Sequence, residues 1–293
     1  MGLYVTFWGV RGSIPTPGHA TQRYGGNTAC IEVRVDDTLF ILDGGSGLRP
    51  MGAAMAARGE MAVHAHMFFS HSHWDHIQGF PFFTPAYCPD TILRVYGTAE
   101  GDRGIFDLLN GQMQDKYFPV QFSDLGAQVI PDDLAGGGKR IGEAVVDYLD
   151  TCHPGGSLAF SVSAYNRKVV YSTDNELDLV LLNRDESLAF PSAPRKFPEH
   201  IVEFMKDSSL LIADGQYTDE EYKTKINWGH PRATTLVDLA MAANVQRLAI
   251  THHDPMQTDE NVDVKIQHCR DRAAAIGYTG MIFGAREGVT LKL

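Results

Sequence analysis

The sequence has few cysteines, a deficit of basic residues and no long apolar run. Its four cysteines, Cys30, Cys88, Cys152 and Cys269, lie far apart without a C-x-x-C pair, so free thiols in a reducing cytoplasm are expected. The apolar runs fall well short of the roughly 18 residues that a membrane-spanning helix needs. Because 25 Lys and Arg face 36 Asp and Glu, the net charge of −11 disfavours a long nucleic-acid partner, but not a small anion at a locally positive site.

The 293 residues carry hydrophobic side chains at 44%, which is enough to bury a large layered core without disulfides. Strand-like and helical stretches alternate almost from end to end, and no repeat is visible. We therefore expect one α/β (α+β) domain over residues 1–293. The weakly periodic stretches near 100–138 and 183–200 are interpreted as surface insertions or lids.

The alternation of apolar and polar residues predicts the following elements. Strands are expected at 3–8, 30–35, 38–42, 62–70, 157–162, 168–172 and 247–251, and helices at 50–57, 234–243 and 259–275. A further helix is expected after a histidine cluster that follows residue 70.

That cluster is the segment Ser70-His71-Ser72-His73-Trp74-Asp75-His76, an H-x-H-x-D-H pattern delivered by an apolar strand. Imidazole nitrogens and carboxylate oxygens are ligands that borderline divalent metals prefer, and a tight turn can project four of them into a small volume. Surface histidines without a role are the weaker interpretation. His71 and His73 can face one ion, while Asp75 and His76 face a second.

The segment resembles a motif of the metallo-β-lactamase superfamily of dinuclear hydrolases, and further strand-end residues match in the family's order. These are Asp43, His153 in T-C-H-P-G-G, Asp174 in Y-S-T-D, and His252 in I-T-H-H-D-P. The resemblance implies the four-layer αββα sandwich of that family. It also implies two metal sites, one with His71, His73 and His153 and one with Asp75, His76 and His252, bridged by Asp174. Asp43 would hold the ring of a ligand histidine through its free N–H group.

Two positions in this set distinguish between alternatives. His252 is favoured over His253 as the ligand because it directly follows the strand that ends at Thr251. Flavodiiron oxidoreductases of the superfamily carry Glu where this chain has His73, so the resemblance favours hydrolysis over redox chemistry.

A second pair of residues, Asp214 and His230 in W-G-H-P-R, looks like the phosphodiesterase branch of the superfamily, which includes tRNase Z and cyclic phosphodiesterases. In that branch an acidic residue orients a histidine that faces the phosphate. For His230 alone, a helix-entry histidine that contacts backbone is the competing interpretation. The short interval between His153 and Asp174 leaves no room for the basic arm with which tRNase Z grips tRNA.

These features together predict a metal-dependent hydrolase that acts on a small phosphodiester such as a cyclic nucleotide. Two divalent ions, zinc by default with manganese or iron as alternatives, would activate a bridging hydroxide for attack on phosphorus. Asp75 would take part in this chemistry, and His230, oriented by Asp214, would assist the leaving oxygen. No membrane partner is expected, and a homodimer is compatible with the sequence. The alternatives are hydrolysis of a thioester, lactone or β-lactam, and a metal-containing sensor with little turnover.

Two glycine-rich loops, at 9–17 and 24–28, could present backbone N–H groups and the Arg11 side chain to a phosphate. They could equally be plain turns, because the glycine spacing of a phosphate-binding loop is absent.

Overall fold

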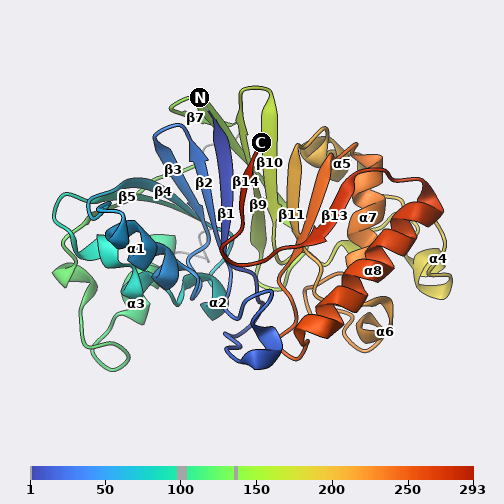
Figure 1. The fold of residues 1–293 in the computed structure, drawn as a ribbon, viewed down its shortest axis with the longest axis horizontal. Coiled ribbons are helices and arrows are strands. Elements are labelled where there is room, and N and C mark those ends of the chain that lie inside the picture. The colour runs from blue at the N-terminus through green and yellow to red at the C-terminus, as the bar shows by residue number, and fades with distance from the viewer. Residues whose placement is uncertain (1, 98–103, 135–137) are drawn as a thin grey trace.

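The computed structural model describes residues 2–97, 104–134 and 138–293, which form two seven-stranded sheets packed face to face (Figure 1). The strands of the first sheet, in their order across it, are β14 (Thr290–Lys292), β1 (Leu3–Gly9), β2 (Cys30–Val35), β3 (Thr38–Leu42), β4 (His64–Phe69), β5 (Ile92–Gly97) and β6 (Gln128–Pro131). Those of the second are β13 (Met281–Gly284), β12 (Arg247–Thr251), β11 (Leu210–Asp214), β10 (Arg167–Ser172), β9 (Ser157–Ala164), β8 (Ala144–Thr151) and β7 (Lys139–Ile141).

Helices cover the outer faces of both sheets, and Figure 1 shows them on the two sides of the strands. The α-helices of the described residues are α1 (Leu48–Ala57), α2 (Trp74–Ile77), α3 (Ile105–Gln112), α4 (Arg184–Ala189), α5 (Glu199–Met205), α6 (Asp219–Tyr222), α7 (Ala233–Ala242) and α8 (Asp259–Ile276). Apolar residues of α1 and α3 pack on the first sheet, and those of α5, α7 and α8 pack on the second. The predicted four-layer αββα arrangement is thereby confirmed.

Three apolar layers hold these elements together. The central one lies between the sheets and joins residues such as Phe7 and Phe40 of the first sheet to Phe160 and Ile212 of the second. Strands that are covered on both faces are apolar at nearly every position, as in β11, where all five residues are buried. Removing this much apolar surface from water is the main stabilising contribution of the sandwich.

The predicted elements are found, with shifted ends. The longest helix, α8, begins after Thr258, whose hydroxyl accepts a hydrogen bond from the Asn261 backbone, and ends at Gly277 in the left-handed conformation. The expected helix after the histidine cluster is the single turn α2, and α1 begins two residues before Pro50.

The stretches interpreted as insertions contribute regular structure. Residues 104–134 supply α3, whose Leu109 is fully buried, and strand β6, which pairs in parallel with β5 at the edge of the first sheet. Residues 100–103 and 135–137 of that interval lie outside the described residues. The interval 183–200 holds α4 and the start of α5, and its Arg195 is buried against Asp238 of α7. A single domain over the whole chain stays a prediction.

The strand directions bring several chain segments to one end of the sandwich. Strands β3 and β4 run parallel in the first sheet, and β10, β11 and β12 run parallel in the second. The carboxyl ends of parallel strands meet at one edge of a sheet, where ligand sites are commonly built. Helix α2 lies at this end, between the two halves (Figure 1).

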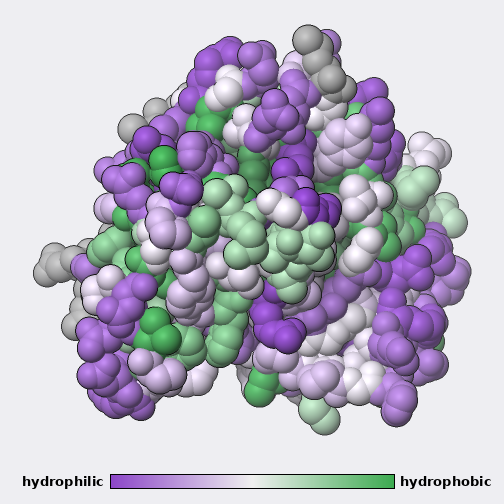
Figure 2. Space-filling view, turned by 60° about the vertical axis from the view of Figure 1, so that its left-hand side comes forward, coloured by the Kyte–Doolittle hydropathy of each residue, from purple (hydrophilic) through white to green (hydrophobic). Residues whose placement is uncertain are grey.

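The outer side of the first half carries an apolar groove of about 620 Å³, lined by residues that include Met61, Phe82, Tyr87 and Phe118. Figure 2, turned to bring this half forward, shows hydrophobic residues gathered between hydrophilic ones. Within the described part of the chain, no helix has the length and apolar character required to cross a bilayer. The homodimer stays a prediction.

Candidate metal centre

Residues that directly follow strands supply the core of the candidate site. Asp43 follows β3, Asp174 comes two residues after β10, and His252 follows β12, and all three have positive φ angles of 61°, 44° and 56°. A positive φ is uncommon for residues other than glycine, and it clusters at functional sites where the surrounding structure enforces it. The turn after each strand therefore aims a side chain back across the sheet edge.

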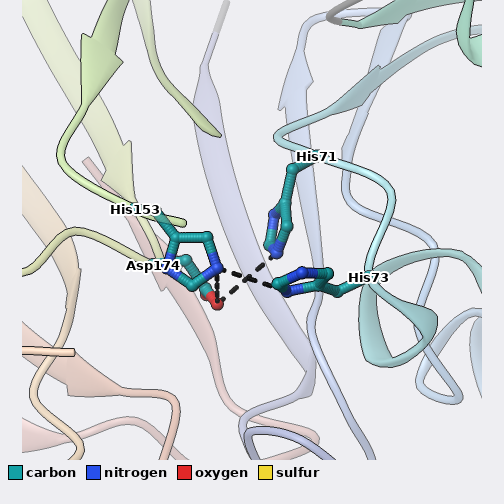
Figure 3. A group of neighbouring side chains, drawn as sticks. All are labelled: His71, His73, His153 and Asp174. Atoms are coloured by element: carbon teal, nitrogen blue, oxygen red, sulfur yellow. Dashed lines mark hydrogen bonds and ion pairs between the residues drawn. The ribbon is translucent and has the colours of Figure 1, made fainter. Parts of the chain in front are cut away.

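The first group of side chains consists of His71, His73, His153 and Asp174, whose ligand atoms lie within 4.8 Å of one another (Figure 3). Oδ2 of Asp174 is 3.5 Å from Nε2 of His71 and 3.6 Å from Nε2 of His153. Nε2 of His153 is 3.2 Å from Nδ1 of His73. Three imidazoles and one carboxylate that converge in this way form a suitable set for a divalent ion.

The second group consists of Asp75, His76 and His252. Oδ2 of Asp75 lies 3.2 Å from Nε2 of both histidines. The other carboxylate oxygen of Asp174, Oδ1, lies 3.3 Å from Nε2 of His76 and 3.2 Å from Nε2 of His252. Asp174 thus directs one oxygen at each group, which is the arrangement that a bridging ligand requires.

The residues fit a metal centre by an independent criterion. Nε2 of His71 and Nε2 of His76 are buried and, among the described residues, make no well-aligned hydrogen bond, although carboxylate oxygens lie 3.2 to 3.5 Å away. Buried polar atoms normally have partners, so these two nitrogens point to ligands that protein groups do not supply. Burial acts to raise the pKa of Asp174, but the neighbouring charges of His252, His76 and His71 outweigh it and hold the pKa well below its usual range. An ionised carboxylate between the groups favours a bound cation.

Asp43 holds the ring of His76 from behind. Its Oδ2 lies 2.8 Å from Nδ1 of His76 and accepts a hydrogen bond from the Tyr171 hydroxyl at 2.7 Å. Its Oδ1 accepts from the backbone N–H of Ser70 at 2.7 Å. This contact leaves Nε2 of His76 as the nitrogen that faces the second group.

Two other histidines are oriented by backbone or amide groups. Nδ1 of His153 is 3.0 Å from the carbonyl oxygen of Gly229, and Nδ1 of His252 is 3.1 Å from Oε1 of Gln216. Gly229 has a φ of 90°, and a Cβ there would lie 2.3 Å from Nδ1 of His153. A Cβ on Gly12 would lie 2.4 Å from the ring of His252. Glycine at these two positions makes room for the imidazoles.

Gln216 also connects the site to a buried lysine. Its backbone N–H donates to Oδ1 of Asp214 at 3.0 Å, and its carbonyl oxygen accepts from Nζ of Lys265 at 3.1 Å. Lys265 donates in addition to Oε1 of Gln257 at 2.8 Å. Burial lowers the pKa of Lys265 to about 8. The lysine on α8 thereby fixes the loop that carries the partner of His252.

Asp214 and His230 lie beside the two groups. Oδ2 of Asp214 is 2.8 Å from Nδ1 of His230, and the imidazole ring stacks on that of His252 with centroids 5.0 Å apart. Burial acts to lower the pKa of His230, but the Asp214 carboxylate outweighs it and raises the pKa to about 9. An imidazole that is held in this way can donate a proton or a hydrogen bond.

His253 and Arg11, two further candidate site residues from the sequence, lie outside the two ligand groups. His253 is buried away from the groups, with Nε2 3.3 Å from the carbonyl oxygen of Ala285, whereas His252 contacts Asp75 and Asp174. Arg11 is fully buried and donates to the carbonyl oxygens of Gly25 and Gln257, so its loop behaves as a turn and its guanidinium does not face solvent.

Sequence reasoning did not assign roles to Tyr171, Gln216 or Lys265. Tyr171 and Gln216 lie close in sequence to Asp174 and Asp214, but their contacts depend on how the strands end. Lys265 gave no signal, because a lysine in a polar helix is usually exposed. Glu176 was also missed: it is buried and accepts the backbone N–H of Gly229 at 2.7 Å, which fixes the carbonyl that orients His153.

Comparison with known proteins agrees with this geometry. Residues 40–253 match the family model described as a beta-lactamase superfamily domain. Ribonuclease Z of Methanosarcina acetivorans is 25% identical, with 88% of this chain and 90% of that protein covered. Among solved structures, the metallo-beta-lactamase fold protein YhfI of Bacillus subtilis has a TM-score of 0.68 at 18% identity, with 99% of each chain covered. Unliganded yeast PDE1 also has a TM-score of 0.68, at 15% identity, with 100% of this chain and 99% of that one covered.

Proposed function

The chain belongs to the beta-lactamase superfamily, and on that premise we propose that its metal centre hydrolyses a small phosphodiester such as a cyclic nucleotide. That it is a metal-dependent phosphodiesterase follows from the family, the His/Asp groups and the ribonuclease Z relatives. The observation that supports the proposal is the pair of Asp214 and His230, which lies beside both ligand groups. Oδ2 of Asp214 is 2.8 Å from Nδ1 of His230.

His71, His73 and His153 would hold one ion, Asp75, His76 and His252 a second, and Asp174 would contact both. Divalent ions bound there supply Lewis-acid stabilisation of the phosphoryl oxygens and a water molecule of lowered pKa. Zinc suits this set of nitrogen and oxygen ligands, and manganese and iron are the alternatives.

The protein groups around the candidate metal sites hold the ligand side chains in place, and one of them, His230, would donate a proton. Asp75 accepts the backbone N–H of Ser13 at 2.7 Å, which holds its carboxylate in place next to His252. His230, held by Asp214 through Nδ1, keeps Nε2 as the nitrogen from which a proton passes to the leaving oxygen. Asp43, Gln216 and the Gly229 carbonyl fix the remaining rings, so the site is organised before substrate binds.

The short interval between His153 and Asp174 favours a small substrate. It is filled by strands β9 and β10, which are joined by a tight turn at Tyr165 and Asn166, both with positive φ. Outside these strands and their turn the interval has only residues 154–156 and Thr173, which are too few to form a protruding arm. The net charge of −11 also opposes binding of a long polyanion.

RNA is the second candidate substrate, and the relatives named ribonuclease Z favour it. These relatives conflict in part with the expectation, based on the net charge and the short interval, that a long nucleic acid does not bind. The two candidates share the reaction at phosphorus and differ in how the rest of the substrate is held.

A substrate panel separates these candidates. Metal-loaded protein would be assayed with cyclic nucleotides, bis-p-nitrophenyl phosphate, a precursor tRNA, nitrocefin and a thioester, and Asp174→Ala would serve as the control for contaminating hydrolases. We expect turnover of the small phosphodiesters that the variant lacks. Efficient tRNA cleavage with a steep salt dependence would replace the small substrate by RNA, and turnover confined to nitrocefin or the thioester would overturn the phosphodiesterase assignment.

A further inference from the structure

Two of the three tryptophans are strongly exposed, and both are next in sequence to residues of the candidate metal centre. Trp8 is partly buried, and its Nε1 donates to Oε2 of Glu32 at 2.7 Å. Trp74 and Trp228, in contrast, expose 78% and 58% of their surface. Tryptophan is highly buried on average, so exposure of two indoles beside one site calls for a ligand that covers them.

The two tryptophans flank residues that are linked through the first ligand group. Trp74 follows His73 at the start of α2, and Trp228 precedes Gly229 in the loop before α7. His73 lies 3.2 Å from His153, whose other nitrogen lies 3.0 Å from the Gly229 carbonyl oxygen. His73 is itself exposed, so the first ligand group reaches solvent next to Trp74.

A cation lies over one of the indoles and near a tyrosine that contacts His230. Nζ of Lys225 lies 4.0 Å from the ring centroid of Trp228 and 5.6 Å from that of Tyr217. The Tyr217 ring in turn packs edge-on against His230, with centroids 5.9 Å apart. Trp228 therefore presents an exposed aromatic face with a positive charge over it, and Tyr217 connects this charge to the buried His230.

We propose that Trp74 and Trp228 are stacking platforms for a nucleobase attached to the scissile phosphate, so that the substrate is a nucleotide phosphodiester. This inference rests on the proposed function and narrows its substrate class. Every nucleobase has a flat π face, and stacking on an aromatic side chain is worth roughly 5- to 150-fold in affinity. Lys225 would lie beside the base and its phosphate.

The test compares a nucleotide with a matched substrate that lacks the base. KM and kcat would be measured for adenosine 3′,5′-cyclic monophosphate and for the same cyclic ribose phosphate with a methoxy group in place of the base. The Kd of AMP would be measured by calorimetry, which needs no turnover. The variants are Trp74→Ala, Trp228→Ala and the two Phe replacements, and Phe190→Ala is the matched control. Phe190 is also exposed, at 64%, but follows α4 in the outer helix layer (Figure 1).

We expect each Ala variant to raise KM for the cyclic nucleotide and Kd for AMP by about fivefold or more. The Phe variants and Phe190→Ala should stay close to wild type, and the base-free substrate should react equally with all of them. Unchanged AMP affinity and KM in both Ala variants, or an equal loss with the base-free substrate, would overturn the inference while leaving phosphodiester hydrolysis in place. Tryptophan-dependent AMP binding without any turnover would support the platforms and reject the proposed function.

Discussion

Nδ1 of His230 lies 2.8 Å from Oδ2 of Asp214, in a buried pair beside the metal-ligand groups. The pair fixes the imidazole and raises the pKa of His230 to about 9, against the opposing effect of burial. The Asp214 carboxylate thus favours the protonated imidazole, which is the state that a general acid needs.

Replacement of His230 by Ala should lower phosphodiester turnover by about 10²- to 10⁴-fold, which is the usual contribution of a positioned acid or base. Asp214→Asn should cause a smaller loss, because the imidazole stays but loses its anionic partner. The loss should shrink for substrates with a p-nitrophenolate leaving group, which departs without a proton. Steady-state kinetics on both substrate types measures the effect.

Metal content decides how that result is interpreted. Asp174, Asp214, His230 and His252 also lie close enough together to hold an ion, so His230 could be a ligand. Elemental analysis of His230→Ala should find the wild-type amount of metal. Loss of an ion would make His230 a ligand, and unchanged turnover would remove the main support for phosphodiester chemistry.

Asp174→Ala should lose at least one of two bound ions per chain, because its two oxygens face different groups at 3.2 to 3.6 Å. Mass spectrometry under native conditions counts the ions in each chain. Asp271→Ala removes an exposed carboxylate on α8, away from the ligand groups, and is the control. Full occupancy in Asp174→Ala would contradict the bridging role.

Asp43→Asn should weaken binding of the second ion by about 10- to 100-fold, since the neutral amide no longer holds His76 as a carboxylate does. Tyr171→Phe removes one donor to the same carboxylate and should have a smaller effect in the same direction. Competition with a chromophoric chelator gives both affinities. Equal affinity in wild type and Asp43→Asn would show that the contact does not tune the site.

The candidate ligands could be proposed from the sequence because they are either contiguous or follow the ends of strands. His71, His73, Asp75 and His76 lie within six positions, and the strand ends bring Asp174 and His252 to them. The roles of these residues stay predictions. The choice of His252 over His253 rested on one residue of spacing, and the positive φ of His252 turns its ring toward Asp75.

What the sequence did not reveal depends on tertiary contacts. Residues 104–134 are polar and weakly periodic, yet β6 completes the sheet edge by pairing with β5, a partner more than 30 positions away. Local patterns carry no information on such pairing, because a short edge strand can be half exposed. Lys265 is hidden in the same way, since only the fold places its helix against Gln216.

His66, between the sheets, predicts a pH dependence of stability. Burial, aided by the Arg94 charge and opposed by Asp132, lowers its pKa from 6.5 to about 4. Between these values the unfolded chain binds a proton that the folded chain does not, so this residue makes the free energy of unfolding fall as pH drops from 6.5 to 4. Urea unfolding at pH 7.5 and 5 should show a smaller decrease for His66→Gln than for wild type. His64→Gln, an exposed change in the same strand, should behave as wild type.

Cleavage of a phosphodiester by this protein should depend on bound metal. Protein stripped by a chelator would be titrated with Zn²⁺ while hydrolysis of bis-p-nitrophenyl phosphate is followed against the number of ions bound. The two groups around Asp174 predict no activity without metal and a steep rise as occupancy passes from one ion to two per chain. Full hydrolytic activity without metal, or no activity with two ions bound per chain, would contradict metal-dependent phosphodiester hydrolysis by this site.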